Sequence, residues 1–127
     1  MKLVGIDYGS SKVGLALGES DIKMALPHKV VAPQELFLEI ERLVEREGLD
    51  LAVMGLPMGM NGLETEQTQT VKKFAAELAE KITIPLVFED ERLSTAQAKR
   101  DGHDDAVAAM YILQSYLDRT YGSNSAK

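Results

Sequence analysis

The chain has 127 residues, of which 45% are hydrophobic, and its formal net charge is −6 at pH 7. This length fits one domain with its own core, and the absence of cysteine excludes disulfide bridges and thiolate zinc sites. With only two histidines, any metal site must rely on oxygen ligands. The acidic balance disfavours binding of nucleic acid by bulk charge, although cations held by carboxylates would reverse the charge locally.

No apolar run approaches the length of a membrane span, and the N-terminal residues contain no small-residue cleavage site. We therefore expect a soluble, cytoplasmic protein. We also expect residues 1–121 to form a single domain and residues 122–127 to form a flexible C-terminal tail, because the tail consists of small and polar residues.

The first third of the chain predicts three antiparallel strands, over residues 2–8, 12–19 and about 23–32, because runs rich in Val, Leu and Ala are separated by short turn signals. Alternation along the first strand places Asp7 on the same face as Leu3 and Gly5, at the strand's C-terminal end. An acid at that position suits a metal or phosphate site. Taken alone, it is equally consistent with a simple turn former.

Helices and strands then alternate. The spacing of apolar residues predicts the following elements: a helix from Pro33 to Gly48, a strand over 51–56, a helix over 64–81, a strand over 84–88, a short helix over 95–99 capped by Ser94, and a helix from Asp104 to about Arg119. This order predicts an α/β fold with a five-stranded mixed sheet, three antiparallel strands followed by two parallel ones, and helices on both faces.

Two further acidic pairs occupy the end of a strand and the start of a helix. Asp90 and Glu91 follow the strand over 84–88, where they could also complement the dipole of a helix. Asp105 heads the apolar stripe of the last helix, whereas Asp104 is better placed as a cap or a solvated residue. Carboxylates that meet at one sheet edge repel one another unless a divalent cation neutralises them. The pattern therefore predicts Mg²⁺ or Mn²⁺, in a two-metal site suited to phosphodiester hydrolysis.

Four ordered blocks resemble the YqgF family, also called RuvX, whose members are RNase H-like bacterial proteins described as pre-16S rRNA nucleases or Holliday junction resolvase homologues. The blocks are Gly5-Ile6-Asp7-Tyr8-Gly9 with Lys12-Val13-Gly14-Leu15-Ala16, Gly55-Leu56-Pro57 with Asn61-Gly62, Asp90-Glu91-Arg92-Leu93-Ser94-Thr95, and Asp105 with Ala108-Ala109 and Ile112 to Tyr116. The resemblance implies an RNase H-like fold with the first strand between the second and the fourth.

The resemblance also implies roles for individual residues. Its implied metal-binding catalytic set is Asp7, Glu91 and Asp105, with Asp90 and Asp104 as reserves. The implied contacts with the nucleic-acid backbone are Lys12, Arg92, Ser94 and Thr95. His103 receives no role, because a single histidine in a polar connection is usually solvated.

Three features depart from the family pattern. Ser94 stands where Thr is usual, which keeps the hydroxyl, and Lys12 stands where Arg is frequent, which keeps the charge but loses bidentate geometry. The connection over Lys99–His103 is shorter than in relatives and lacks their extra basic residues. A missing substrate loop would weaken nucleic-acid binding and cleavage.

We therefore expect a metal-dependent nuclease that acts on structured nucleic acid, with processing of pre-16S ribosomal RNA as the leading role. The alternatives are a Holliday junction resolvase and a non-catalytic nucleic-acid or ribosome-associated module. A phosphotransferase is disfavoured, because that fold family closes two domains over its nucleotide. The expected partners are an RNA precursor or branched DNA, with no membrane, and the expected state is a monomer or weak homodimer. No dimer surface is marked in the sequence, although four apolar residues could contribute to one if they are exposed: Phe37, Leu38, Met58 and Met60.

Overall fold

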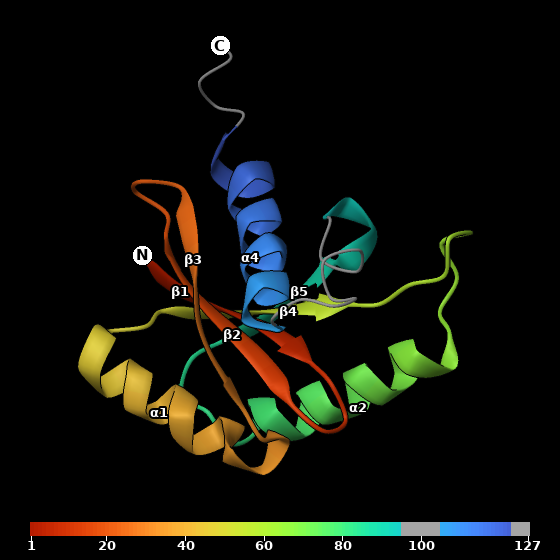
Figure 1. Cartoon of the computed structure of the whole chain (residues 1–127), viewed down its shortest axis with the longest axis horizontal. Coiled ribbons are helices and arrows are strands. Elements are labelled where there is room, and N and C mark those ends of the chain that lie inside the picture. Colours follow the sequence, from red (N-terminus) through yellow and green to blue (C-terminus); the bar gives the residue numbers. More distant parts are fainter. Residues whose placement is uncertain (95–104, 123–127) are drawn as a thin grey trace.

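The computed structural model describes residues 1–94 and 105–122. These residues form a five-stranded sheet flanked by helices (Figure 1). The strands are β1 (Lys2–Tyr8), β2 (Val13–Glu19), β3 (Met24–Val31), β4 (Leu51–Leu56) and β5 (Leu86–Asp90). Their order across the sheet is β3-β2-β1-β4-β5, so β1 is central, as the sequence resemblance implied.

The pairing directions match the predicted mixed sheet. β1, β2 and β3 form an antiparallel meander, while β1, β4 and β5 run parallel to one another. Because β1, β4 and β5 point the same way, their C-terminal ends meet at one edge of the sheet, where ligands of such sheets collect. We call this edge the carboxyl edge.

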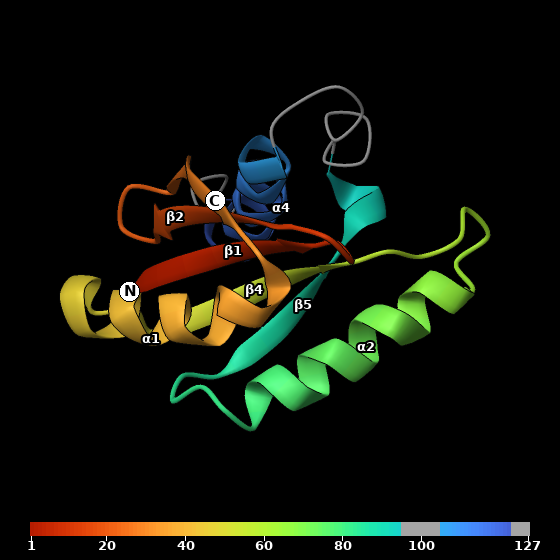
Figure 2. The same cartoon turned by 60° about the horizontal axis from the view of Figure 1, so that its bottom comes forward.

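The helices divide unequally between the two faces. A 3₁₀ turn over Pro33–Glu35 leads into α1 (Leu36–Glu47), and α2 (Glu66–Ala79) follows β4. Figure 2 shows α1 and α2 on one face of the sheet and α4 (Asp105–Tyr121) alone on the other. The prediction of helices on both faces is therefore confirmed.

Each face has its own hydrophobic core. Val4, Ile6 and Leu15 belong to the core beneath α1 and α2, whereas Leu3 and Ala16 belong to the core beneath α4. The alternation predicted for β1 is thus confirmed, and it places Asp7 on the α4 face. Among the helices of the described ranges, none is both long enough and apolar enough to cross a lipid bilayer.

Several element boundaries differ from the predictions, and two of these differences have a clear physical cause. The second helix begins at Glu66, because Thr65 is its N-cap and accepts a hydrogen bond from the backbone N–H of Thr68 at 3.2 Å. The last strand runs over Leu86–Asp90 instead of 84–88. Pro85 precedes it and offers no N–H to a sheet ladder, while pairing with β4 continues to Asp90.

The edge of the sheet formed by β3 is protected against pairing with a further strand. The side chain of Gln114 on α4 accepts from the Ala25 N–H at 2.9 Å and donates to the Lys23 carbonyl at 2.9 Å. Pro27, further along β3, has no N–H to offer. These features are typical of edge strands that resist aggregation.

Candidate active site

Asp7 lies at the carboxyl edge in the centre of the sheet, and only 3% of its surface is exposed. It pairs across the ladder with Gly14 of β2. The hairpin between them turns tightly at Gly9, where a Cβ atom would lie 2.7 Å from the Lys12 carbonyl oxygen. The predicted position of Asp7 at the end of a strand is therefore confirmed.

Asp105 reaches the same edge because the start of α4 rests directly on β2. A Cβ atom on Gly14 would lie 2.0 Å from the Asp105 carbonyl oxygen and 2.8 Å from the Ala106 nitrogen. Since Gly14 is the ladder partner of Asp7, this contact puts the first turn of α4 next to Asp7. The side chain of Asp105 is 13% exposed, and its Oδ2 lies 3.8 Å from the Lys12 Nζ.

Glu91 approaches from the other side of Asp7. It begins η2 (Glu91–Leu93), the 3₁₀ turn that follows β5, and it is 5% exposed. A Cβ atom on Gly55 would lie only 2.7 Å from the Glu91 Oε2. Gly55 is one residue beyond the last paired residues of β1 and β4, Ile6 and Met54, so Glu91 covers the position beside Asp7.

Asp7, Glu91 and Asp105 thus come from three elements to one face of the sheet at its carboxyl edge. Their oxygen donors are of the type that Mg²⁺ and Mn²⁺ prefer, so the residues present fit such ions in chemistry. Within residues 1–94 and 105–122, however, no three Asp, Glu or His side chains are already arranged to hold a metal ion. The structure therefore brings the three elements together without forming a coordination sphere.

Asp90 has a different task from Glu91. Its carboxylate pairs with the guanidinium of Arg92, with Arg92 Nη2 at 2.6 Å from Oδ2, and it also accepts the Arg92 backbone N–H at 2.9 Å. These hydrogen bonds hold the pKa of Asp90 below its ordinary value and raise that of Arg92. A Cβ atom on Gly62 would lie 3.3 Å from Arg92 Nη1, so the guanidinium also borders the β4–α2 loop.

The remaining predicted contacts fall into two groups. Lys12 and Arg92 are exposed near the carboxyl edge, and Ser94 is half-buried, with its hydroxyl donating to the Glu91 carbonyl at 3.3 Å. Thr95, the connection over 99–103, the helix predicted over 95–99 and Asp104 lie outside the described residues.

Glu89, which the sequence pattern did not single out, is fully buried on the α4 face of β5. Its ladder partner is Gly55, so it stands in the same row across the sheet as Asp7. Ser115 donates to its Oε2 at 2.8 Å, and Arg119 forms an ion pair with it that raises the pKa of Arg119. Side chains two residues apart in a strand share a face, so Glu89 could have been placed on the same face as Glu91. The predicted strand over 84–88 ended one residue before Glu89, so this relation was not used.

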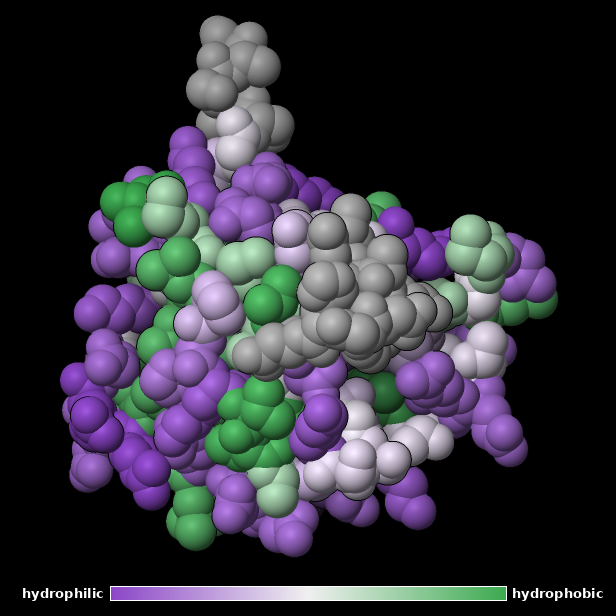
Figure 3. Space-filling view, in the orientation of Figure 1, coloured by the Kyte–Doolittle hydropathy of each residue, from purple (hydrophilic) through white to green (hydrophobic). Residues whose placement is uncertain are grey.

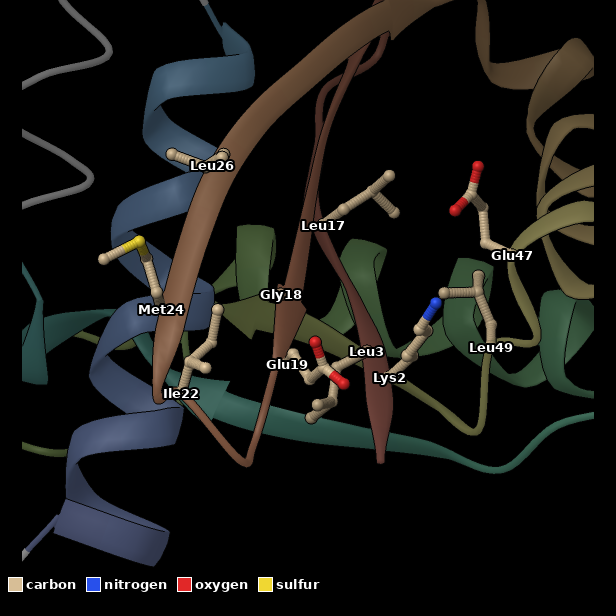
Figure 4. Close-up of a pocket in the computed structure, with 10 residues that line it drawn as sticks. All are labelled: Lys2, Leu3, Leu17, Gly18, Glu19, Ile22, Met24, Leu26, Glu47 and Leu49. Carbon is tan, nitrogen blue, oxygen red and sulfur yellow. The ribbon is translucent and has the colours of Figure 1, made fainter.

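A separate apolar hollow of about 200 Å³ lies at the opposite end of β1. Figure 4 shows Leu3, Leu17 and Leu49 around it, with Ile22 and Met24 from the β2–β3 hairpin alongside. Figure 3 shows hydrophobic surface over this hairpin and polar residues over much of the rest of that face. The residues that line it do not include Asp7, Glu91 or Asp105.

The four apolar residues considered for a dimer surface are not equally exposed. Leu38 is 63% exposed and Met60 is 92% exposed, but Phe37 and Met58 are only partly accessible. These residues also come from two separate elements, α1 and the β4–α2 loop. The expectation of a monomer or weak homodimer stays a prediction.

Comparisons with known proteins match both the sequence and the fold. The solved structures that resemble this chain include RuvC from Thermus thermophilus in complex with a Holliday junction substrate, with a TM-score of 0.59 at 13% identity and coverage of 97% of each chain. A second T. thermophilus RuvC structure matches with a TM-score of 0.58, also at 13% identity, over 96% of this chain and 97% of that chain. At this identity the likeness establishes the RuvC-like, RNase H-like fold.

Sequence relatives are considerably closer. A protein of Rickettsia africae (strain ESF-5) named "Putative pre-16S rRNA nuclease" is 37% identical over 131 aligned residues, covering 91% of this chain and 85% of the relative. A protein of Rickettsia felis with the same name is 39% identical over the same coverage. Since the alignment is longer than the 127 residues of this chain, these relatives carry residues that it lacks.

A family model described as "RuvX: Holliday junction resolvase" matches residues 1–119, almost the whole chain. The four sequence blocks, the central position of β1 and the gathering of acids at the carboxyl edge agree with that match. The chain belongs to the RuvX family.

Proposed function

We propose that this chain is a metal-dependent nuclease whose catalytic and metal-binding residues are Asp7, Glu91 and Asp105. The observation that carries the proposal is the convergence of β1, η2 and the first turn of α4 at the carboxyl edge, over Gly14 and Gly55. Both glycines lack the side chain that would otherwise separate these elements. Residues 1–121 would act as one domain, since the family match extends over nearly all of them.

The chemistry follows from the donors. Divalent Mg²⁺ or Mn²⁺ ions, two in our proposal, would supply an activated water and stabilise the charge that develops on a scissile phosphate. Asp7, Glu91 and Asp105 would hold these ions with carboxylate oxygens, and their burial would keep them in place. No histidine or cysteine nucleophile is needed for such a reaction.

Basic groups beside the acids would bind the substrate backbone. Lys12 is 64% exposed and lies on the Asp105 side of the edge, whereas Arg92 lies on the Glu91 side. In a chain with net charge −6, such local cations are needed to meet phosphate. Lys12, Arg92, Ser94 and Thr95 are therefore our proposed contacts with the nucleic-acid backbone.

We propose pre-16S ribosomal RNA as the substrate, since the relatives at 37–39% identity are named for it. A ribosomal RNA precursor would be processed in the cytoplasm. The second candidate is a four-way DNA junction, favoured by the description of the matching family.

The test is cleavage of a labelled ribosomal RNA precursor and a four-way DNA junction, each with Mg²⁺, with Mn²⁺ and with a chelator. Asp7→Asn serves as the matched variant, because it preserves the shape of the side chain. Metal-dependent cutting that disappears in Asp7→Asn supports the nuclease and identifies its substrate. Binding without cutting would instead point to a non-catalytic module, and unchanged cutting by Asp7→Asn would refute the role of that residue.

A further inference from the structure

Glu89 is a fully buried carboxylate that the proposed chemistry does not use. Burying a charged group is unfavourable unless it is paired and hydrogen-bonded. Here α4 supplies both kinds of partner. The Ser115 hydroxyl donates to Oε2 at 2.8 Å, and the Arg119 guanidinium pairs with the carboxylate through Nη2 and, at 3.4 Å, through Nε.

Ser115 makes a second contact that reaches the candidate active site. Its single hydroxyl hydrogen also faces the carbonyl oxygen of Leu93, the last residue of η2, at 3.1 Å, so it is shared between that carbonyl and the Glu89 carboxylate. Glu91 is the first residue of the same short turn, and the Glu91 carbonyl accepts the Ser94 N–H at 3.2 Å. One side chain of α4 therefore contacts both the end of β5 and the turn that carries Glu91.

The same helix begins with Asp105, the third member of the proposed catalytic set. Ser115 lies ten residues further along α4, or about 15 Å along a rigid helix. The start of α4 is fixed by its backbone contact with Gly14. A second fixed point at Ser115 sets the direction of the helix relative to η2, and hence the placement of Asp105 relative to Glu91.

We propose that Glu89, Ser115 and Arg119 form a positioning device, the β5–α4 clamp, that holds Glu91 in place relative to Asp105 for metal binding. This inference rests on the proposed function. Partner residues of this kind orient metal ligands without touching the metal, and their loss typically weakens metal affinity by 10- to 100-fold. The clamp residues would act only through Glu91 and Asp105.

A purely structural role for Ser115 would affect stability alone, and α4 offers a matched control beside it. Gln114 makes two hydrogen bonds at 2.9 Å, to Ala25 and Lys23, and so also ties α4 to the sheet. Those bonds hold β3, on the side away from η2. Gln114→Ala should therefore lower stability without changing metal affinity.

The experiment measures binding of Mn²⁺ alone by titration calorimetry, together with unfolding by denaturant, for the whole chain and its variants. Ser115→Ala should bind Mn²⁺ about tenfold more weakly than the unmodified chain. Gln114→Ala should bind it as the unmodified chain does. Ser115→Thr, which keeps the hydroxyl, should restore most of the affinity.

Arg119→Lys provides an independent variant that should fold, because the Arg119 side chain is 52% exposed. It keeps the charge but loses the fork of donors, so we expect roughly threefold weaker Mn²⁺ binding. If Ser115→Ala binds Mn²⁺ as tightly as the unmodified chain does, the clamp is overturned and the proposed function is left intact. If Ser115→Ala does not fold, the same comparison is made with Arg119→Lys, and equal Mn²⁺ affinity overturns the clamp in the same way. Failure of the unmodified chain to bind Mn²⁺ would overturn the proposed metal site, and the clamp with it.

Discussion

The two faces of the sheet are packed in opposite ways. The α4 face is built from small residues where the helix crosses it, and these are Gly5, Gly14, Ala16, Gly18 and Gly55. The opposite face presents large side chains to α1 and α2, among them Val4, Ile6, Leu15 and Met54. A Cβ atom on Gly5 would lie 2.8 Å from the carbonyl oxygen of Ala109, so α4 contacts the strands with its own backbone.

This difference gives the two faces different roles: the α4 face positions the acids of the candidate active site, and the opposite face contributes more to the stability of the fold. Small residues bury little apolar area, but they let the first turn of α4 approach Asp7 closely enough to bring Asp105 to the carboxyl edge. Large side chains on the other face bury more apolar area, which is the main source of folding free energy. Asp7, Glu89 and Glu91 all belong to the α4 face. Substitutions on the two faces should consequently have different effects on cleavage and on unfolding.

The largest effect is expected for Gly14→Ala, where the added methyl group would overlap the backbone of Asp105. Overpacking against backbone should lower the free energy of unfolding by about 3 kcal/mol. Displacement of Asp105 by about 1 Å should reduce metal-dependent cleavage roughly 100-fold. The free energy of unfolding is measured by denaturant titration through the transition. Cleavage is measured under conditions below the transition, where the variant is folded.

Gly48→Ala is the control for Gly14→Ala. Gly48 ends α1 with φ +73°, and a Cβ atom there would meet nothing within 4 Å. The left-handed conformation should cost alanine about 1 kcal/mol relative to glycine, while cleavage stays unchanged. If Gly14→Ala cleaves as well as Gly48→Ala, close packing of α4 on β2 does not position the active site.

A smaller effect, on stability alone, is expected for Ile6→Val on the opposite face. Ile6 is fully buried in the core beneath α1 and α2. Removal of one methylene should lower the free energy of unfolding by about 1 kcal/mol. The cleavage rate at substrate saturation should match that of the unmodified chain, although Ile6 is the chain neighbour of Asp7. A loss of cleavage comparable to that of Gly14→Ala would contradict the separation between the faces.

The smallest effect is expected for Asp90→Asn. The hydrogen bonds from Arg92 lower the pKa of Asp90, so the ionised form stabilises the fold above the ordinary carboxyl pKa of about 4. Because this pair is partly exposed, the substitution should lower the free energy of unfolding at neutral pH by at most about 1 kcal/mol. Denaturant unfolding at several pH values measures the difference.

The pH dependence of that difference has a definite sign. As the pH falls through the depressed pKa of Asp90, the carboxylate is protonated and its contribution disappears. The unmodified chain and Asp90→Asn should therefore converge in stability at low pH. A difference that persists or grows as the pH falls would show that Arg92 does not stabilise ionised Asp90.

Most of the sheet could be predicted from the sequence, because its signals are local. The alternation that puts Asp7 and Ile6 on opposite faces depends only on strand geometry. Turn residues and apolar runs likewise identified the three antiparallel strands and the order of the later elements. Glu91 is buried and Asp90 pairs with Arg92. The choice of Glu91 over Asp90 came from the family resemblance, because the local pattern left both acids open, and its catalytic role stays a prediction.

The predictions failed where a boundary depended on partners distant in sequence. The end of β5 is set by pairing with β4, so Glu89 and Asp90 joined a strand that the local pattern ended at Phe88. Glu89 then required Ser115 and Arg119, which lie 26 and 30 residues further along the chain. The local sequence around Glu89 does not indicate that Ser115 and Arg119 are its partners.

The sequence by itself determined which residue types could do the chemistry: carboxylates at a strand end, after a strand and at a helix start, with no thiol and two histidines. It also determined the periodicities that build the strands and helices. Only the tertiary structure decided that α4 packs on β2 at Gly14 and η2 packs on β4 at Gly55, on either side of Asp7. The physical reason is that a glycine in the sequence specifies only that a side chain is absent. Which segment of the protein packs into the space above it depends on tertiary packing.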